Sequence, residues 1–188
     1  MELSSFFDYP QNGAIERPEE LIFLAEQSSG EWGKIFECTG THRFQKNEIV
    51  INQGEIKRGF YIVTRGSLEV LMPKGLKTGD MERISLIEQG CVFGEQSFLD
   101  GKPRSANIRA LTDGEMLTMN LETFEVLAAR EPELARLILF DLARILSLRL
   151  RQTTSIMMTL AGKNYEYYIN HSKAIISKLY SDSIKYTD

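Results

Sequence analysis

Between about residues 42 and 120, short apolar runs alternate with turns that centre on glycine. The runs alternate or are rich in β-branched residues, which is typical of strands. Six strands are predicted, at 48–52, 60–64, 67–72, 82–87, 106–110 and 115–119, with a Gly- and Lys-rich loop from Pro73 to Asp80. Short strands at this spacing predict an antiparallel barrel or double-sheet roll.

The chain before these strands is predicted to be helical. Pro18 suits a first helical turn, two glutamates follow it, and an apolar face comes next, made by Leu21, Ile22, Leu24 and Ala25. Trp32, Ile35 and Phe36 predict a second short helix. We therefore expect an N-terminal helical segment over residues 1–41.

After the last strand the period becomes helical again. Asn120 can cap a short helix over 121–130, and Pro132 can begin a long helix that runs to about Thr154. The long helix carries two apolar stripes, Leu134, Ile138, Leu142 and Ile145 in one and Leu139, Leu146 and Leu150 in the other. One stripe is enough to pack on the roll, so the second is covered either within the monomer or by the same helix of a second copy.

Residues 155–188 predict one more amphipathic helix with a frayed end, and this tail could cover the second stripe in a monomer. We predict three parts: the N-terminal segment 1–41, the roll with its long helix over 42–154, and the tail 155–188. The fold class is α+β, an antiparallel β-roll of the double-stranded β-helix or jelly-roll type with N-terminal helices and a long C-terminal helix.

Composition narrows the possibilities. The net charge of −4 and the pI near 5.4 argue against a surface dominated by nucleic-acid binding. Cys38, Cys91, His42 and His171 fit no metal-ligand spacing, so the two cysteines are expected to be free thiols. No apolar run reaches the ~20 residues that cross a bilayer, and the start has no basic region of a signal peptide. A cytoplasmic protein is expected.

The segment most informative about function runs from 93 to 110, with the sequence FGEQSFLDGKPRSANIRA. It resembles the phosphate-binding cassette of cyclic-nucleotide-binding domains, the family of catabolite activator proteins, regulatory subunits of cyclic-AMP-dependent kinase and cyclic-nucleotide-gated channels. Gly54-Glu55, the 60–63 run, Gly66 and Gly90 agree with the family pattern in the same order. The resemblance covers about 42–154 and implies a roll that binds a cyclic nucleoside monophosphate.

The chemistry of these residues suits such a ligand. Arg104 can hold phosphate oxygens through a charge-assisted fork, and Gly94 lets the backbone come close. A short helix at 95–98 would point N–H groups at the phosphate, while Glu95 can accept a hydrogen bond from the ribose 2′-hydroxyl. No metal or other cofactor is needed. The predicted phosphate and ribose contacts are Gly94, Glu95, Gln96, Ser97, Arg104, Ser105 and Ala106.

By the same resemblance, strand residues line the base and ribose, although a role as core residues is equally consistent: Val70, Ile84, Ser85 and Ile87. Where the activators have a Thr-Ser pair that meets the purine, this chain has Arg149 and Leu150. Arg149 could stack on the base or be a solvated charge. Ser105 after the phosphate arginine favours cyclic AMP over cyclic GMP.

The 34 residues after the long helix are too few for a winged helix-turn-helix, and no enzyme motif is present. Three alternatives follow: a stand-alone sensor that signals to an unknown protein partner, a truncated or divergent transcription regulator, and a scaffold with an unoccupied pocket. We expect a non-enzymatic sensor, a homodimer through the 132–154 helix, and no nucleic-acid or membrane partner.

Overall fold

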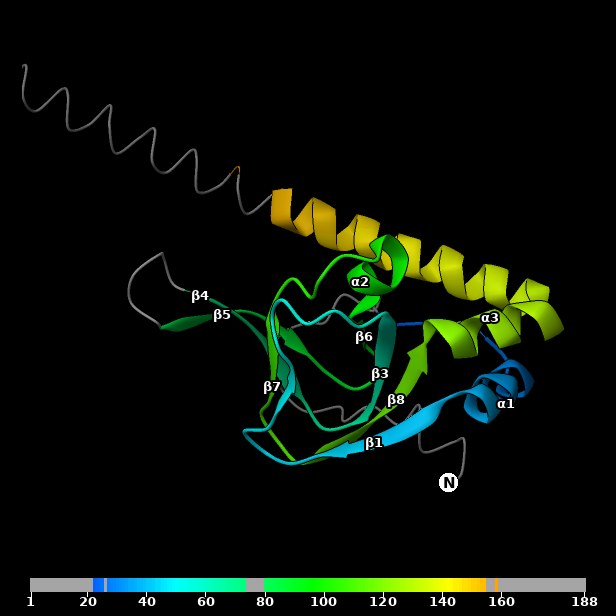
Figure 1. Ribbon diagram of the computed structural model, residues 1–188, viewed down its shortest axis with the longest axis horizontal. Helices are drawn as coiled ribbons and strands as arrows, with labels where there is room; N and C mark the ends of the chain where they lie inside the picture. Colours follow the sequence, from blue (N-terminus) through cyan, green and yellow to red (C-terminus); the bar gives the residue numbers. More distant parts are fainter. Residues whose placement is uncertain (1–21, 26, 74–79, 155–157, 159–188) are drawn as a thin grey trace, which may run out of the picture. The chain divides into compact units, whose positions relative to one another are not determined.

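A computed structural model describes residues 22–25, 27–73, 80–154 and 158 (Figure 1). The chain divides into two compact units, Met1–Leu146 and Ser147–Asp188. The start of the first predicted helix, the 74–79 part of the loop and almost all of the tail lie outside the described residues. The predicted division into three parts, with boundaries after residues 41 and 154, stays a prediction.

Eight strands in the first unit form two four-stranded sheets, with the orders β1-β8-β3-β6 and β2-β7-β4-β5. Every pairing between them is antiparallel, so the predicted β-roll is confirmed. The strands are β1 (Gly40–Phe44), β2 (Ile49–Ile51), β3 (Gly59–Arg65), β4 (Leu68–Pro73), β5 (Met81–Ile87), β6 (Val92–Phe93), β7 (Asn107–Ala110) and β8 (Gly114–Asn120).

All six predicted strands are present, and the sequence pattern missed two, β1 and β6. Four of the five β1 residues are exposed, so the strand lacks the alternation that marks a half-buried one. The β6 strand has only two residues and forms by pairing with the middle of β3. Both strands therefore depend on their partners rather than on a pattern of their own.

Strand β3 separates two apolar cores because its side chains alternate. Phe60 and Ile62 belong to a core shared with the helices, whereas Val63 and the partly buried Tyr61 pack into the core between the sheets. The core between the sheets includes Leu68 from β4 and is the interior of the roll. Tyr61 thus faces the space in which the family resemblance expects a ligand.

The helices of the described region are α1 (Ser29–Cys38), α2 (Glu95–Asp100), α3 (Leu121–Arg130) and a long helix over residues 132–154. Three of them were predicted as helices in their own right, and α2 was predicted as the short helix of the cassette. Asn120 caps α3 as expected, since its side-chain oxygen accepts from Thr123 N at 2.8 Å. None of these helices has the length and apolar character that crossing a bilayer requires.

The first stripe of the long helix is the buried one. Leu134, Ile138, Leu142 and Ile145 are 0–4% exposed in the core that the helices share with β3. Each buried aliphatic side chain of this size contributes roughly 1.5–3 kcal/mol. In the second stripe Leu139 is 38% exposed, and its neighbour Phe140 is 69% exposed.

The prediction of a helix over residues 22–25 is wrong. Ile22 forms an isolated antiparallel bridge with Cys91, and residues 23–25 form a turn in which Leu24 has a φ of 51°. Leu24 N donates to Asp141 Oδ2 at 2.6 Å, and Arg144 Nη2 donates to the Ile22 carbonyl at 3.0 Å. These partners on the long helix hold the segment in its bridge and turn, so tertiary contacts override its local helical preference.

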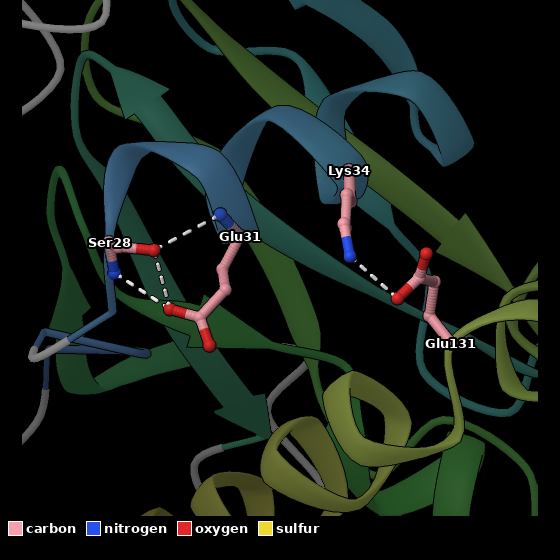
Figure 2. A network of polar contacts seen from close by, with 4 residues as sticks. All are labelled: Ser28, Glu31, Lys34 and Glu131. Carbon is pink, nitrogen blue, oxygen red and sulfur yellow. Dashed lines mark hydrogen bonds and ion pairs between the residues drawn. The ribbon is translucent and has the colours of Figure 1, made fainter.

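Helix α1 begins with a capping box, shown in Figure 2. Ser28 Oγ accepts from Glu31 N at 3.3 Å, and Glu31 Oε2 accepts from Ser28 N at 2.9 Å. One turn later, Lys34 Nζ lies 2.7 Å from Glu131 Oε2, which connects α1 to the residue that follows α3. Cys38 at the end of α1 is a free thiol, and so is Cys91, as predicted.

Candidate functional site

The candidate site is built around Arg104, which is only 3% exposed. Its main chain is fixed to the turn before β3, because Arg104 N donates to Glu55 O and Gly54 N donates to Arg104 O, each at 2.9 Å. Its Nη1 donates to Gly59 O at 2.8 Å and to Gly94 O at 2.7 Å. Three separate backbone segments therefore position one guanidinium group.

The rest of the guanidinium is far less well satisfied. Nη2 donates to the Tyr61 hydroxyl at a long 3.4 Å, and Nε is buried without a hydrogen-bond partner. Nε and Nη2 share one edge of the planar group, and such an edge can donate two parallel hydrogen bonds to the oxygens of one anion. The edge of Arg104 that suits bidentate binding is therefore the one with unused donors.

Within the described part of the chain, no carboxylate forms an ion pair with Arg104. Glu55, whose backbone carbonyl accepts from Arg104 N, forms its ion pair with Lys57 instead, with Lys57 Nζ 2.6 Å from Glu55 Oε1. The hydrogen bond from Lys57 lowers the pKa of Glu55, and the same contact raises the pKa of Lys57. The charge of Arg104 also contributes to the lowered pKa of Glu55, so this carboxylate lies near the guanidinium without a direct ion pair. A buried cation without a direct ion pair is costly, and a bound anion would offset that cost.

The remaining predicted phosphate contacts lie in or next to α2. Gly94 precedes this helix in the left-handed conformation, with a φ of 77°, and Glu95 and Ser97 are buried at 3% and 2% exposure. Gln96 and Ser105 are exposed, and Ala106 is half-buried. The predicted short helix at 95–98 is confirmed as the first part of α2, and it presents its N-terminus next to the carbonyl of Gly94 that Arg104 contacts.

The residues predicted to line the base lie on β4 and β5. Val70 is directly opposite Ser85, and Leu68 is opposite Ile87, so these side chains share the interior face of their sheet. Ser85 is nevertheless exposed, as are all residues of β5 from Met81 to Leu86, so this part of the strand is accessible to solvent.

Ile84 is the extra residue of a register shift between Val70 and Leu71, and it is 56% exposed. Its predicted contact with the base stays a prediction. Arg149 belongs to the second unit, Ser147–Asp188, and its contact with a base likewise stays a prediction.

Two groups that accept hydrogen bonds from Arg104 were not predicted from the sequence: the Tyr61 hydroxyl and the carbonyl of Gly59. The run Phe60–Val63 was identified as a strand and as part of the family pattern, with no role for Tyr61 in the site. A signal was present, because a tyrosine hydroxyl on the interior face of a strand needs a polar partner there. A backbone carbonyl such as that of Gly59 has no sequence signal.

The structure is a β-roll in which a buried arginine with an unused hydrogen-bond donor lies beside a short helix that begins after a glycine. This combination defines a class of regulatory domain that binds a small ligand. Residues 41–131 match the sequence model of the family described as the cyclic nucleotide-binding domain. Among curated proteins, the chain is similar to cAMP-dependent protein kinase regulatory subunits.

The subunit of Emericella nidulans is 30% identical over 107 residues, which are 57% of this chain and 25% of the relative. That of Blastocladiella emersonii is 33% identical over 92 residues, 49% of this chain and 22% of the relative. The chain spans about a quarter of the length of these relatives.

Solved structures agree with this assignment. The Thermus thermophilus catabolite activator protein superposes with a TM-score of 0.63 and 25% identity, over 76% of this chain and 63% of that one. A cyclic nucleotide-binding domain from Methylobacillus flagellatus KT has a TM-score of 0.64 and 20% identity, over 74% and 82% of the two chains, and shows the likeness of fold. Residues 41–131 are thus similar, in sequence and in fold, to the cyclic nucleotide-binding domain family.

Proposed function

We propose that this domain binds a cyclic nucleoside monophosphate, with cyclic AMP preferred, and acts as a regulatory sensor rather than as an enzyme. The observation that carries the proposal is the Arg104 guanidinium, which is buried, lacks a carboxylate partner among the described residues, and keeps Nε unpaired. A phosphodiester has one negative charge and two exocyclic oxygens, which match the single charge and the free edge of Arg104.

The contact between the phosphate and Arg104 would set the positions of the ribose and the base. The buried carboxylate of Glu95, one residue after Gly94, would accept a hydrogen bond from the ribose 2′-hydroxyl. The base would lie toward Val70 and Ser85, where β5 is accessible to solvent. The preference for cyclic AMP rests on Ser105 and on the kinase regulatory subunits that the chain resembles.

Calorimetric titration with cyclic AMP, cyclic GMP and cyclic dinucleotides tests the proposal. Arg104→Ala should weaken cyclic AMP binding about ten- to a hundredfold, because a charge-assisted contact is lost. Arg43→Ala is the matched control, since Arg43 is a surface arginine whose side chain is 86% exposed. Wild-type protein that binds none of these nucleotides would contradict the proposal, and so would an Arg104→Ala variant with unchanged affinity.

The role of Glu95 has its own test. Glu95→Gln should lose affinity for cyclic AMP but lose little for the 2′-deoxy analogue, in which the contact is already absent. Equal losses for both ligands would show that Glu95 acts through the fold rather than through the ribose.

The sensor is proposed to work as a homodimer through the 132–154 helix and to signal to a protein partner. The support is an apolar groove on the first unit whose lining includes the exposed side chains of Leu139 and Phe140. The groove is lined by Phe124, Ala128, Pro132, Ala135, Arg136, Leu139 and Phe140. Exposed apolar surface of this kind commonly marks an interface.

A further inference from the structure

We infer that Tyr61 is a positioning residue for Arg104, and that its ring holds the guanidinium with the Nε–Nη2 edge available to the ligand. The inference rests on the proposed function, because the anion is taken to be the cyclic phosphodiester. It concerns a residue on β3, outside the cassette of residues 93–110.

The contacts of Arg104 show what the backbone alone can do. Nη1 has two protons, and both are used on the carbonyls of Gly59 and Gly94. Two in-plane bonds from one nitrogen fix that corner of the group and favour one plane, but neither contacts the opposite edge, where Nη2 makes only a long bond and Nε makes none. A further contact is needed to set the direction of the other edge.

Tyr61 supplies that contact in two ways. The guanidinium carbon of Arg104 lies 5.4 Å from the centroid of the Tyr61 ring, within the range of a cation–π interaction. The Tyr61 hydroxyl accepts from Nη2 at 3.4 Å, which is longer than a strong N–H···O hydrogen bond. The hydroxyl can therefore give up Nη2 to a phosphate oxygen at little cost, while the ring continues to orient the plane.

The ring of Tyr61 is itself held in place. It stacks on Phe93 with 5.0 Å between centroids and 21° between planes, and the two residues are paired partners of β3 and β6. Phe93 is 2% exposed and directly precedes Gly94. A Cβ on Gly94 would lie 3.2 Å from Tyr61 Cδ2, so the ring is packed against the start of the cassette.

Two substitutions separate the ring from the hydroxyl. Tyr61→Phe keeps the ring and loses only a long hydrogen bond, so cyclic AMP affinity should change less than about threefold. Tyr61→Leu removes the ring and should weaken cyclic AMP binding roughly two- to tenfold relative to Tyr61→Phe. Phe60→Leu is the control, because Phe60 is buried on the opposite face of β3 and contacts Phe23 and Phe98 instead.

A second experiment measures the cation–π interaction itself, and it keeps the inference testable if Tyr61→Leu fails to fold. Phenylalanines with one, two or three ring fluorines at position 61 keep the shape of the ring and reduce its negative face stepwise. Cyclic AMP affinity should fall with each fluorine, by roughly two- to fivefold over the series. The same series at position 60 should leave affinity unchanged.

The outcomes distinguish this inference from the function on which it rests. If wild-type protein binds no cyclic nucleotide, both the proposed function and the role of Tyr61 are wrong. If wild-type protein binds and Arg104→Ala does not, but fluorination at position 61 leaves affinity flat, only the positioning role is overturned.

Discussion

Gly94 and Arg104 are packed so closely that only glycine fits at position 94. A Cβ there would lie 2.6 Å from Arg104 Nη1, and the carbonyl of Gly94 accepts from the same nitrogen at 2.7 Å. The φ of 77° is also one that residues with a Cβ rarely adopt. The glycine thus serves both the turn into α2 and the close approach of Arg104.

Gly94→Ala should reduce cyclic AMP affinity by more than about tenfold, because Arg104 must move away from the new methyl group. The substitution should also cost about 1 kcal/mol of unfolding free energy through backbone strain. Calorimetry and chemical denaturation measure the two effects separately.

Gly101→Ala is the matched control at the other end of α2. Gly101 also has a positive φ, 70°, but a Cβ added to it would come no closer than 3.7 Å to another residue, which is an ordinary contact with Arg58 Nε. Gly101→Ala should therefore lose a similar amount of unfolding free energy and keep its affinity for cyclic AMP. Equal losses of affinity in both variants would contradict the close packing of Gly94 on Arg104 as the cause.

Asp141→Ala should lower the unfolding free energy by about 1.5–3 kcal/mol, measured by urea denaturation. Asp141 accepts from the buried Leu24 N at 2.6 Å and from Arg144 Nε at 2.5 Å, so the substitution leaves a buried N–H unpaired. Glu133→Gln is the comparison, because Glu133 also pairs with an arginine three residues later but is 82% exposed. A change of similar size in both variants would mean that the contact with Leu24 contributes little.

Ser28→Ala should destabilise α1 by about 1 kcal/mol, because the capping oxygen is lost. Hydrogen bonds from the Ser28 hydroxyl and backbone N–H lower the pKa of Glu31 below its ordinary value of 4.5. A depressed carboxyl pKa stabilises the fold above that value and loses the effect as pH falls through the folded-state pKa.

The stability difference between wild type and Ser28→Ala should therefore narrow below about pH 4.5. Thermal denaturation between pH 3 and pH 7 measures it, with Ser29→Ala as the control that leaves the cap intact. A difference that stays constant over this range would show that the Glu31 carboxylate is not part of the cap in solution.

Leu139→Glu should convert a helix-mediated dimer into a monomer, because the exposed stripe would carry a charge into the interface. Light scattering at micromolar concentration should give twice the chain mass for wild type and a mass near 21.4 kDa for the variant. Ile56→Glu is the control, since Ile56 is 79% exposed and lies in the turn before β3. A wild-type mass near 21.4 kDa, with and without cyclic AMP, rules the dimer out.

Local patterns predicted most of the elements because each is encoded over a few neighbouring residues. Alternation predicted β4, β-rich runs between glycine turns predicted β3, β5 and β8, and the cap at Asn120 predicted the start of α3. The buried stripe of the long helix, Leu134 to Ile145, follows from its period alone. The cassette motif predicted that Gly94, Glu95 and Arg104 belong to one site, and the structure shows Gly94 and Arg104 in contact.

What only the tertiary structure decided are the contacts between residues far apart in the chain. The turn at Ile22–Ala25 replaces a predicted helix because Asp141 and Arg144, more than a hundred residues away, bind its backbone. Gly59 and Tyr61 approach Arg104 only because β3 pairs with β6, directly before Gly94. The sequence by itself determined which side chain is proposed to bind the anion, because the motif around Arg104 is local. The pairing of distant strands decided that the Nε–Nη2 edge of Arg104 is the one with unused hydrogen-bond donors.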